Sequence, residues 1–357
     1  MLMHLKETVA RPEYDFLRTN PHLGPNIMFL TLGGSHAYGT NIEGSDIDVR
    51  GVAANTMEEL FGLSNFEQAI DNATDTTVYG FKKYLGLIMN CNPNVIEMLG
   101  CRPQDYVQVS PGGQLLLDNK HLFLSRKAMY SFGGYAQAQL RRLQIAVARH
   151  RVSPEEKADF ILTTCNSSMN LKENEHGIPH GLFKLKTAGF KENGDPVINV
   201  YVDDTQAFHV FETMGIPLAE MKGYLGELAG IVKSYDSLGR RNERAKDKSD
   251  KQLNKHAMHL VRLYLMALDI LEKGEINTYR DKDHDLLMSI RAGKYMLPDG
   301  TYAPEFFDMV TEYDKRLQYA GKHTDLPDHP ERNQVEELAI EINRLNLSRM
   351  GGRVLNG

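Results

Sequence analysis

A glycine-rich turn followed by two closely spaced aspartates constrains the fold of this chain more than any other stretch. It reads LGGSHAYGTNIEGSDIDVRGV and covers residues 32–52. An apolar run ends at Leu32, and the two glycines after it allow the backbone to turn sharply or to approach a ligand closely. The pattern predicts a strand, a tight turn with a short helix, and a second strand that carries the acidic pair.

The acidic pair consists of Asp46 and Asp48. In the strand predicted for 45–54, both side chains point to one face, while Ile47 and Val49 enter the core. The two carboxylates would then lie about 6 to 7 Å apart along the strand. Like charges on one face are unfavourable unless a cation neutralises them, and Mg²⁺, with Mn²⁺ as an alternative, prefers such oxygen ligands. The interpretation without a ligand is a solvated Asp-x-Asp on an exposed strand edge.

The glycine turn suits an anion. Ser35 offers a hydroxyl just where a helix is predicted to begin at His36, and a helix N-terminus carries free backbone N–H groups. A phosphate-binding turn and a metal-binding pair would therefore lie on adjacent strands. The alternative for Gly33 and Gly34 is a tight turn that binds no ligand.

Composition excludes several classes of protein. The chain has 357 residues, which predicts about two domains, and its 41% hydrophobic and 25% charged residues are typical of a globular protein. A formal charge of -6 argues against non-specific binding of nucleic acid over the whole surface. No apolar run approaches the roughly 20 residues of a membrane-spanning helix, and the N-terminus is charged too early for a signal peptide, so we expect a cytoplasmic protein with no membrane partner. The three cysteines show no Cys-x-x-Cys spacing, which predicts buried thiols.

The pattern of apolar residues changes near residue 125. Region 1–125 predicts strands and helices in a small mixed α/β arrangement, with strands at 26–34, 45–54 and 75–81 and helices at 56–63 and 82–100, the last interrupted at Pro93. Region 126–357 predicts helices at 126–150, 154–171, 216–235, 250–273 and 331–347, and a β-hairpin at 183–202. We therefore predict an α+β protein in which a small mixed-sheet domain, 1–125, is followed by a mainly helical domain, 126–357.

Residues 32–52 resemble the signature of the nucleotidyltransferase superfamily related to DNA polymerase beta. In that signature an apolar strand leads to Gly-Ser, a short helix and an Asp-x-Asp strand. The likeness is closer still to predicted nucleotidyltransferases of the YcgL type from bacteria and phages. Further similar segments are YGFKKYLGLIMNCNPNVIEMLG (79–100), GYAQAQLRRL (134–143), KHAMHLVRLYLMALDILEKGEI (255–276) and HDLLMSIRAGKY (284–295).

The resemblance implies a Mg²⁺-dependent enzyme that moves a nucleoside monophosphate from a nucleoside triphosphate, with ATP the first candidate, to a hydroxyl acceptor. Pyrophosphate is released. Asp46 and Asp48 would hold two Mg²⁺ ions, and Asp75 is the best match to the third carboxylate of the superfamily. Asp71 is the fallback for that third position, and the structural alternative for Asp75 is the cap of a turn.

Nucleotide binding is assigned to residues of both predicted domains. In the first domain they are Gly33, Gly34, Ser35 and Ser45, with the Gly34 backbone and Ser35 orienting the β and γ phosphates. In KQLNKHAMHLVRLYL, the side chains of Lys255, His259 and Arg262 share one helical stripe and His256 lies beside it. This stripe could clamp phosphates of the nucleotide or of the acceptor, or it could be a solvated or ion-paired face.

Other functions stay open at this point. The acceptor could be the end of an RNA or tRNA, a protein hydroxyl or a small molecule, and the oligomeric state is not determined. A non-catalytic nucleotide-binding module, such as a toxin–antitoxin-type regulator, predicts the loss of a carboxylate, yet all three are present. A metal-dependent glycosyltransferase also uses Asp-x-Asp but predicts no Gly-Gly-Ser before it.

Overall fold

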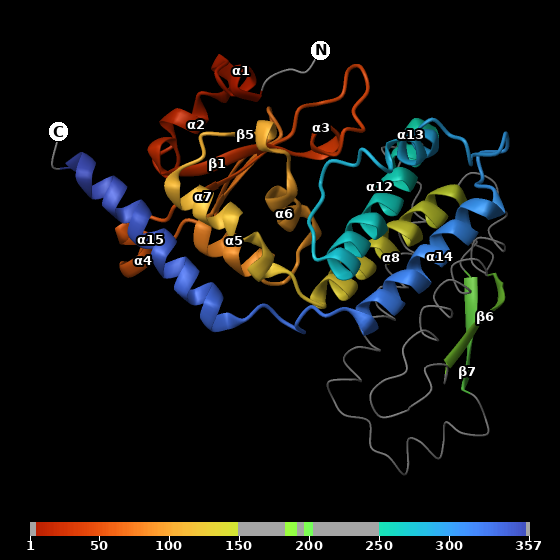
Figure 1. The fold of residues 1–357 in the computed structure, drawn as a ribbon. Coiled ribbons are helices and arrows are strands. Elements are labelled where there is room, and N and C mark those ends of the chain that lie inside the picture. Colours follow the sequence, from red (N-terminus) through yellow and green to blue (C-terminus); the bar gives the residue numbers. More distant parts are fainter. Residues whose placement is uncertain (1–4, 149–182, 191–195, 203–249, 355–357) are drawn as a thin grey trace, which may run out of the picture. The chain divides into compact units, whose positions relative to one another are not determined.

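The computed structural model describes residues 5–148, 183–190, 196–202 and 250–354 (Figure 1). The chain divides into two compact units. One unit comprises Met1–Gln139, Asn254–Tyr295 and Ala303–Gly357, and the other comprises Leu140–Leu253 and Met296–Tyr302. The first unit thus joins the predicted region 1–125 to helices from the C-terminal part of the chain, while the functional division at residue 125 stays a prediction.

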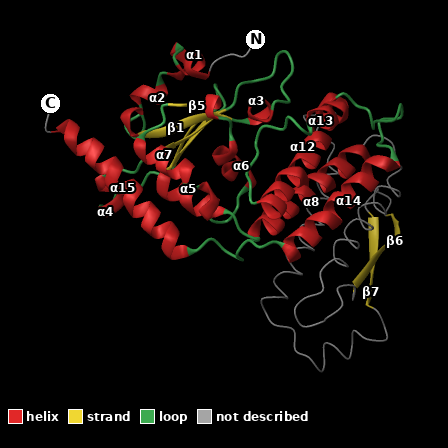
Figure 2. Ribbon diagram, in the orientation of Figure 1, coloured by secondary structure: helices red, strands yellow, loops and turns green. Residues whose placement is uncertain are grey.

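A mixed five-stranded sheet forms the centre of the first unit (Figure 2). Its strand order is β3-β4-β2-β1-β5. β2 and β4 run parallel, and the other neighbouring pairs are antiparallel. The strands are β1 (Ile27–Leu32), β2 (Val49–Ala53), β3 (Gln68–Asp71), β4 (Thr76–Gly80) and β5 (Tyr106–Val107). The sheet together with the helices of the C-terminal part confirms the predicted α+β class.

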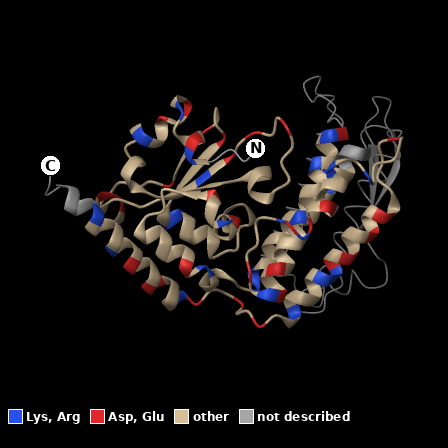
Figure 3. Cartoon of the chain, turned by 45° about the horizontal axis from the view of Figure 1, so that its top comes forward, with Lys and Arg blue, Asp and Glu red and all other residues tan. Residues whose placement is uncertain are grey.

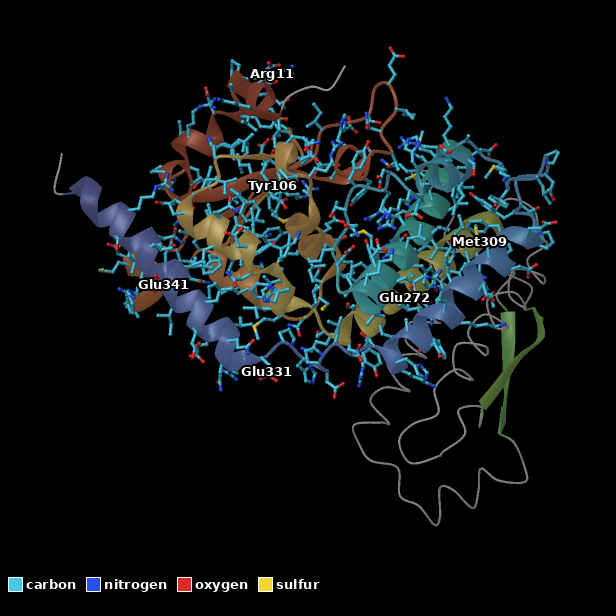
Figure 4. The ribbon with its side chains drawn as sticks, viewed as in Figure 1. Arg11, Tyr106, Glu272, Met309, Glu331 and Glu341 are labelled. Atoms are coloured by element: carbon cyan, nitrogen blue, oxygen red, sulfur yellow. The ribbon has the colours of Figure 1, made fainter. Side chains whose placement is uncertain are left out.

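β1 lies inside the sheet, between β2 and β5, and all six of its residues are buried. Five of them are apolar and the sixth is Thr31. The neighbouring strand β5 carries Tyr106, which is labelled in Figure 4. The Tyr106 ring meets the ring of Phe29 edge-on, with the centroids 5.7 Å apart. The Tyr106 hydroxyl donates to the backbone oxygen of Met98 at 2.6 Å, which satisfies its polar end. The strand therefore places the glycine turn at its carboxyl end on a rigid support.

Helices surround this sheet and continue in the C-terminal part. In the N-terminal part they are α1 (Leu5–Val9), α2 (Phe16–Thr19), α3 (Gly34–Tyr38), α4 (Met57–Phe61), α5 (Phe81–Ile88), α6 (Pro93–Ile96) and α7 (Pro111–Asp118). The later helices are α8 (Lys127–Ala148), α12 (Asp250–Leu268), which continues as a π-helical turn Asp269–Lys273, α13 (His284–Arg291), α14 (Pro304–His323) and α15 (Arg332–Val354).

Two adjacent glycines allow α7 to fit between the sheet and α15, as the ribbon of the first unit shows (Figure 1). A Cβ atom on Gly113 would lie 2.4 Å from the backbone oxygen of Met28 in β1. A Cβ atom on Gly112 would lie 2.7 Å from Oδ1 of Asn346 in α15. The C-terminal helix is thus part of the same compact unit as the sheet.

Several predicted elements are present with shifted ends. The predicted helix at 82–100 breaks before Pro93, where Asn92 caps α6, and a 3-10 turn follows at Glu97–Gly100. The predicted strand 45–54 is shorter and begins only at Val49. β3, β5, α13 and α14 are not predicted from the sequence, although Phe306, Val310 and Leu317 of α14 are buried on one helical face.

The predicted hairpin is confirmed by β6 (Phe183–Phe190) and β7 (Pro196–Val202), which pair antiparallel. Two predicted helices, 154–171 and 216–235, and Cys165 lie outside the described residues. Cys91 and Cys101 are buried free thiols, as expected. Among the described helices, none is both long enough and apolar enough to cross a membrane.

Candidate functional site

The glycine turn lies directly against the carboxylate of Asp48. Gly33 is extended, and its N–H donates to the backbone oxygen of Asp48 at 2.8 Å. Gly34 has a φ of +56°, and a Cβ atom there would lie 1.6 Å from Oδ2 of Asp48. Only glycine fits at position 34, because any side chain would both strain the backbone and occupy the place of the carboxylate.

The helix after the turn is short. α3 begins at Gly34, two residues before the predicted start at His36, so Ser35 lies in its first turn. It ends at Tyr38 and is followed by Gly39, which adopts the left-handed conformation with a φ of +73°. The backbone N–H groups at the start of such a helix have no partner within the helix and point away from its end.

Asp48 and Asp75 lie side by side because β2 and β4 run parallel, with Val49 opposite Thr76. Each aspartate directly precedes its strand, and the two carboxyl groups share a hydrogen bond. Burial, followed by this contact, raises the pKa of Asp48 to about 7, whereas the hydrogen bond from Asp48 lowers the pKa of Asp75. A proton carried by Asp48 and donated to ionised Asp75 therefore compensates part of the charge.

Asp46 is exposed, and both Asp46 and Asp48 precede β2, so the prediction that they lie within a strand is wrong. The strand begins too late to place both side chains on one face. Within the described ranges, no three carboxylate, imidazole or thiol groups converge as a metal site. Asp46 therefore does not join Asp48 and Asp75 in a preformed set of three ligands.

Arg50 also belongs to this site, although it is not among the site residues predicted from the sequence. Its Nη2 atom lies 3.6 Å from Oδ1 of Asp48 and 3.2 Å from Oδ1 of Asp75. Its Nη1 atom donates to the backbone oxygens of Asp75 at 2.5 Å and Val49 at 3.0 Å. The two-residue period of a strand, which puts Arg50 on the same face as Asp48, is the signal that could have found it.

Asp71 serves the turn between β3 and β4. Its Oδ2 atom accepts from the backbone N–H of Thr74 at 2.9 Å and from the Thr74 hydroxyl at 2.7 Å. Of the two candidates for the third carboxylate, Asp75 contacts Asp48 and Asp71 caps the turn. The capping function considered for Asp75 thus belongs to Asp71.

Ser45 shapes the loop that leads to the acidic residues. Its hydroxyl accepts from the backbone N–H of Ile42 at 2.9 Å. Its backbone oxygen contacts Nε2 of His36 at 3.3 Å, which ties the loop to α3.

The predicted basic stripe on α12 divides into an exposed and a buried part. Lys255 is exposed, and its positive charge lowers the pKa values of both Asp48 and Asp75. His256 is half-buried. Arg262 is buried and paired with Glu97, with Nη1 3.1 Å from Oε2, and His259 contacts Arg262.

This placement corrects the prediction for Arg262, which is ion-paired instead of clamping a phosphate. The Arg262 guanidinium is buried and committed to Glu97, so it does not reach solvent as a phosphate clamp would require. His259 is half-buried, and a contact of its imidazole with a phosphate stays a prediction. Lys255 is the member of the stripe whose charge acts on the acidic pair.

A cavity of about 320 Å³ lies elsewhere in the first unit, beside the π-helical turn. Its lining carries acidic and basic side chains that pair with one another, such as Glu272 with Arg316 and Asp269 with Arg280. It contains neither the glycine turn nor Asp48 and Asp75.

Comparison with known proteins agrees with this geometry. Residues 5–161 match the family described as the RNA repair pathway DNA polymerase beta family. No curated protein and no solved structure matches the chain. The matched range includes the glycine turn, Asp46, Asp48 and Asp75, and it ends before Lys255. The resemblance to the polymerase beta-like nucleotidyltransferases is thus confirmed for residues 5–161, which carry the candidate site.

Proposed function

We propose that this chain transfers a nucleoside monophosphate from a nucleoside triphosphate to a hydroxyl acceptor and releases pyrophosphate. The observation that carries the proposal is the contact of Asp48 with both Gly34 and Asp75. The glycine turn has no side chain in the way of phosphate oxygens, and the two adjacent carboxyl groups are ligands of the kind that a divalent cation on those phosphates requires. The family match over the same residues supports it.

The carboxyl groups fit a divalent cation in their chemistry. Asp48 and Asp75 offer adjacent oxygen atoms whose charge is compensated by a proton and by Arg50, and Asp46 is exposed two residues away. We propose that these three aspartates hold Mg²⁺, with Mn²⁺ as an alternative. When bound, the ions would neutralise the phosphates and lower the pKa of the attacking hydroxyl.

The chain's own residues would bind and orient the nucleotide. The backbone at Gly33 and Gly34 leaves room for phosphate oxygens, and the N–H groups at the start of α3 with the Ser35 hydroxyl would donate to them. Lys255 and His256 would approach from α12, and Ser45 would hold the loop in place. ATP is the first triphosphate to test. Positioning and charge compensation supply most of the catalysis in such a transfer.

We propose an RNA end as the acceptor to test first, because the matching family is described by an RNA repair pathway. Acidic and basic residues are interspersed along the described helices rather than gathered in one basic face on the view shown (Figure 3). This surface favours recognition of a short end over a long duplex. A protein hydroxyl and a small molecule are the other acceptors.

The test incubates the full chain and Mg²⁺ with each α-labelled nucleoside triphosphate and either RNA with a free 3′ hydroxyl, a protein fraction or a metabolite fraction. We expect label in the RNA fraction. The Asp48→Asn variant should lose about 10³-fold in transfer rate, while its melting temperature stays equal or rises because a poorly solvated acid has been removed. Full activity of an Asp46→Asn/Asp48→Asn double variant would overturn the proposal.

A non-catalytic nucleotide-binding module is the second candidate. It is favoured by Arg50, whose guanidinium already lies beside both carboxyl groups. Such a module would bind a nucleoside triphosphate with equal affinity in the presence and absence of Mg²⁺ and would transfer no label. The proposed enzyme would bind it more tightly with Mg²⁺.

A further inference from the structure

A buried polar cluster joins the end of α3 to α12. Tyr38, the last residue of α3, is buried, and its hydroxyl donates to both carboxylate oxygens of Glu97, at 2.8 and 2.9 Å. The Arg262 guanidinium lies over the Tyr38 ring, 3.6 Å from its centroid, and donates to Oε2 of Glu97 at 3.1 Å. Burial raises the pKa of Tyr38 well above its ordinary value, so its hydroxyl stays a donor.

His259 completes the cluster on α12. Nη2 of Arg262 lies 2.9 Å from Nδ1 of His259. Burial, followed by the charge of Arg262, lowers the pKa of His259 well below its ordinary value. The imidazole is therefore neutral, Nδ1 accepts the hydrogen bond from Arg262, and the proton is on Nε2.

The backbone around Tyr38 is held by the segment that follows α12. The oxygen of Tyr38 accepts from the N–H of Arg280 at 3.1 Å. The backbone oxygen of Glu97 accepts a hydrogen bond from the Thr278 hydroxyl at 2.5 Å. The backbone oxygen of Gly100 accepts one from the Thr278 N–H at 3.1 Å. One stretch of chain thus fixes both Tyr38 and the turn that carries Glu97.

Such anchoring matters because α3 has only five residues. A helix of this length is not stable by itself, so contacts at its ends determine its orientation. Its first residue, Gly34, meets Asp48, and its last residue, Tyr38, meets Glu97 and Arg262. Movement of the Tyr38 end would therefore shift Gly34 relative to the Asp48 carboxyl group at the other end.

We propose that Tyr38 and Arg262 are positioning residues that hold α3, and with it the Gly33–Gly34 turn beside Asp48, in the arrangement that binds the nucleoside triphosphate. This inference rests on the proposed function. Arg262 thereby contributes to nucleotide binding through α3, without touching the nucleotide. A buried arginine–carboxylate pair is a poor source of net stability but fixes one arrangement of the elements it joins.

The decisive variant is Tyr38→Phe, which removes one hydroxyl and keeps the ring under Arg262. The phosphate contacts are made in both the ground state and the transition state, so a less ordered α3 should weaken both equally. We expect KM for the nucleoside triphosphate to rise about 5- to 20-fold, while kcat changes by less than about threefold. Arg262→Lys should show the same split with a smaller rise in KM, because lysine keeps the charge but not the planar contacts.

Tyr264→Phe is the matched control. Like Tyr38, Tyr264 is a buried tyrosine whose hydroxyl donates to a carboxylate, that of Asp314 at 2.9 Å, but it lies on α12. Within the described part of the chain, its side chain makes hydrogen bonds and a ring contact with α8 and α14 and none with α3. Its melting temperature should fall about as much as that of Tyr38→Phe, and its KM should equal the wild-type value. If both tyrosine variants lose stability but neither changes KM, the cluster is only structural and the positioning proposal is overturned.

Failure of the proposed function gives a different result. Wild-type protein would then transfer no nucleotide, and the same variants would be compared by equilibrium binding of a fluorescent ATP analogue. A Kd raised about 5- to 20-fold in Tyr38→Phe but not in Tyr264→Phe would support the positioning role in a binding protein. Equal Kd values, or no binding by the wild type, would overturn it.

Discussion

Two carboxylate–arginine groups in the first unit differ in what surrounds them. At the glycine turn, Arg50 contacts Asp48 and Asp75 with 23% of its side chain exposed, and Asp75 is 61% exposed. Between α3 and α12, Arg262 contacts Glu97. The exposed fraction of the side chain is 1% for Arg262 and 10% for Glu97. The first group faces water and the second is enclosed.

The difference shows which group can take up a ligand. A partly exposed carboxyl pair can exchange its proton or its arginine contact for another cation at small cost, because water screens the change. A buried pair cannot lose one partner without leaving a charge in a poorly solvated place. The exposed group is therefore suited to chemistry and the buried group to fixing the position of α3.

The largest expected effect tests the buried group. Arg262→Met leaves the Glu97 carboxylate without its cation and should lower the free energy of unfolding by about 3–5 kcal/mol. Arg50→Met should lower it by less than about 1 kcal/mol, because that pair is partly exposed. Chemical denaturation of both variants gives the comparison, and equal losses would remove the distinction between the two groups.

The next effect tests the contact between the glycine turn and Asp48. Gly34→Ala combines a strained φ of +56° with a Cβ atom 1.6 Å from Oδ2 of Asp48. We expect a loss of about 2–3 kcal/mol in the free energy of unfolding, together with loss of nucleotide binding. Gly44→Ala is the control, because Gly44 has a φ of +79° but no heavy atom within 4 Å of a Cβ. It should cost only about 1 kcal/mol, and a similar loss in the two variants would contradict the contact.

The smallest effect follows pH. Because the pKa of Asp48 is raised to about 7, the folded chain keeps a proton that the unfolded chain loses near its ordinary value of 3.8. The stabilisation from Asp48 is therefore present at low pH and is lost as pH rises toward 7. Asp75 has a lowered pKa and stays ionised in both the folded and the unfolded state between about pH 4.5 and pH 8.

Thermal or urea unfolding of the wild type and of Asp48→Asn checks this sign. The wild type should lose about 1–2 kcal/mol relative to the variant between about pH 4.5 and pH 8, less than the full shift implies because the site is partly exposed. A difference between the two that does not change with pH would show that Asp48 has an ordinary environment.

Much of the local architecture could be predicted. The sequence predicts the strand before Gly33, the hairpin at 183–202 and the break at Pro93. These features follow from side-chain alternation, turn residues and proline, which act within a few residues of the chain. The choice of Asp75 over Asp71 as the neighbour of Asp48 also agrees with the structure.

Other features could not be predicted from spacing alone. The stripe on α12 gave no sign that Arg262 is enclosed while Lys255 is exposed, because both belong to one helical face. The start of β2 at Val49 depends on pairing with β1 and β4, and this pairing leaves Asp46 outside the strand. The packing of α7 between β1 and α15 joins residues that are far apart in the chain.

The sequence by itself determined the order of a buried strand, a glycine turn and an acidic segment that leads into a second strand, because backbone preferences and side-chain alternation act locally. Only the tertiary structure decided that Asp48 contacts Asp75, that the Arg50 guanidinium lies beside the Asp75 carboxyl group, and that Arg262 is buried against Glu97. These contacts depend on which distant elements pack together, and burial rather than residue type then determines whether a charge is available for chemistry or committed to the fold.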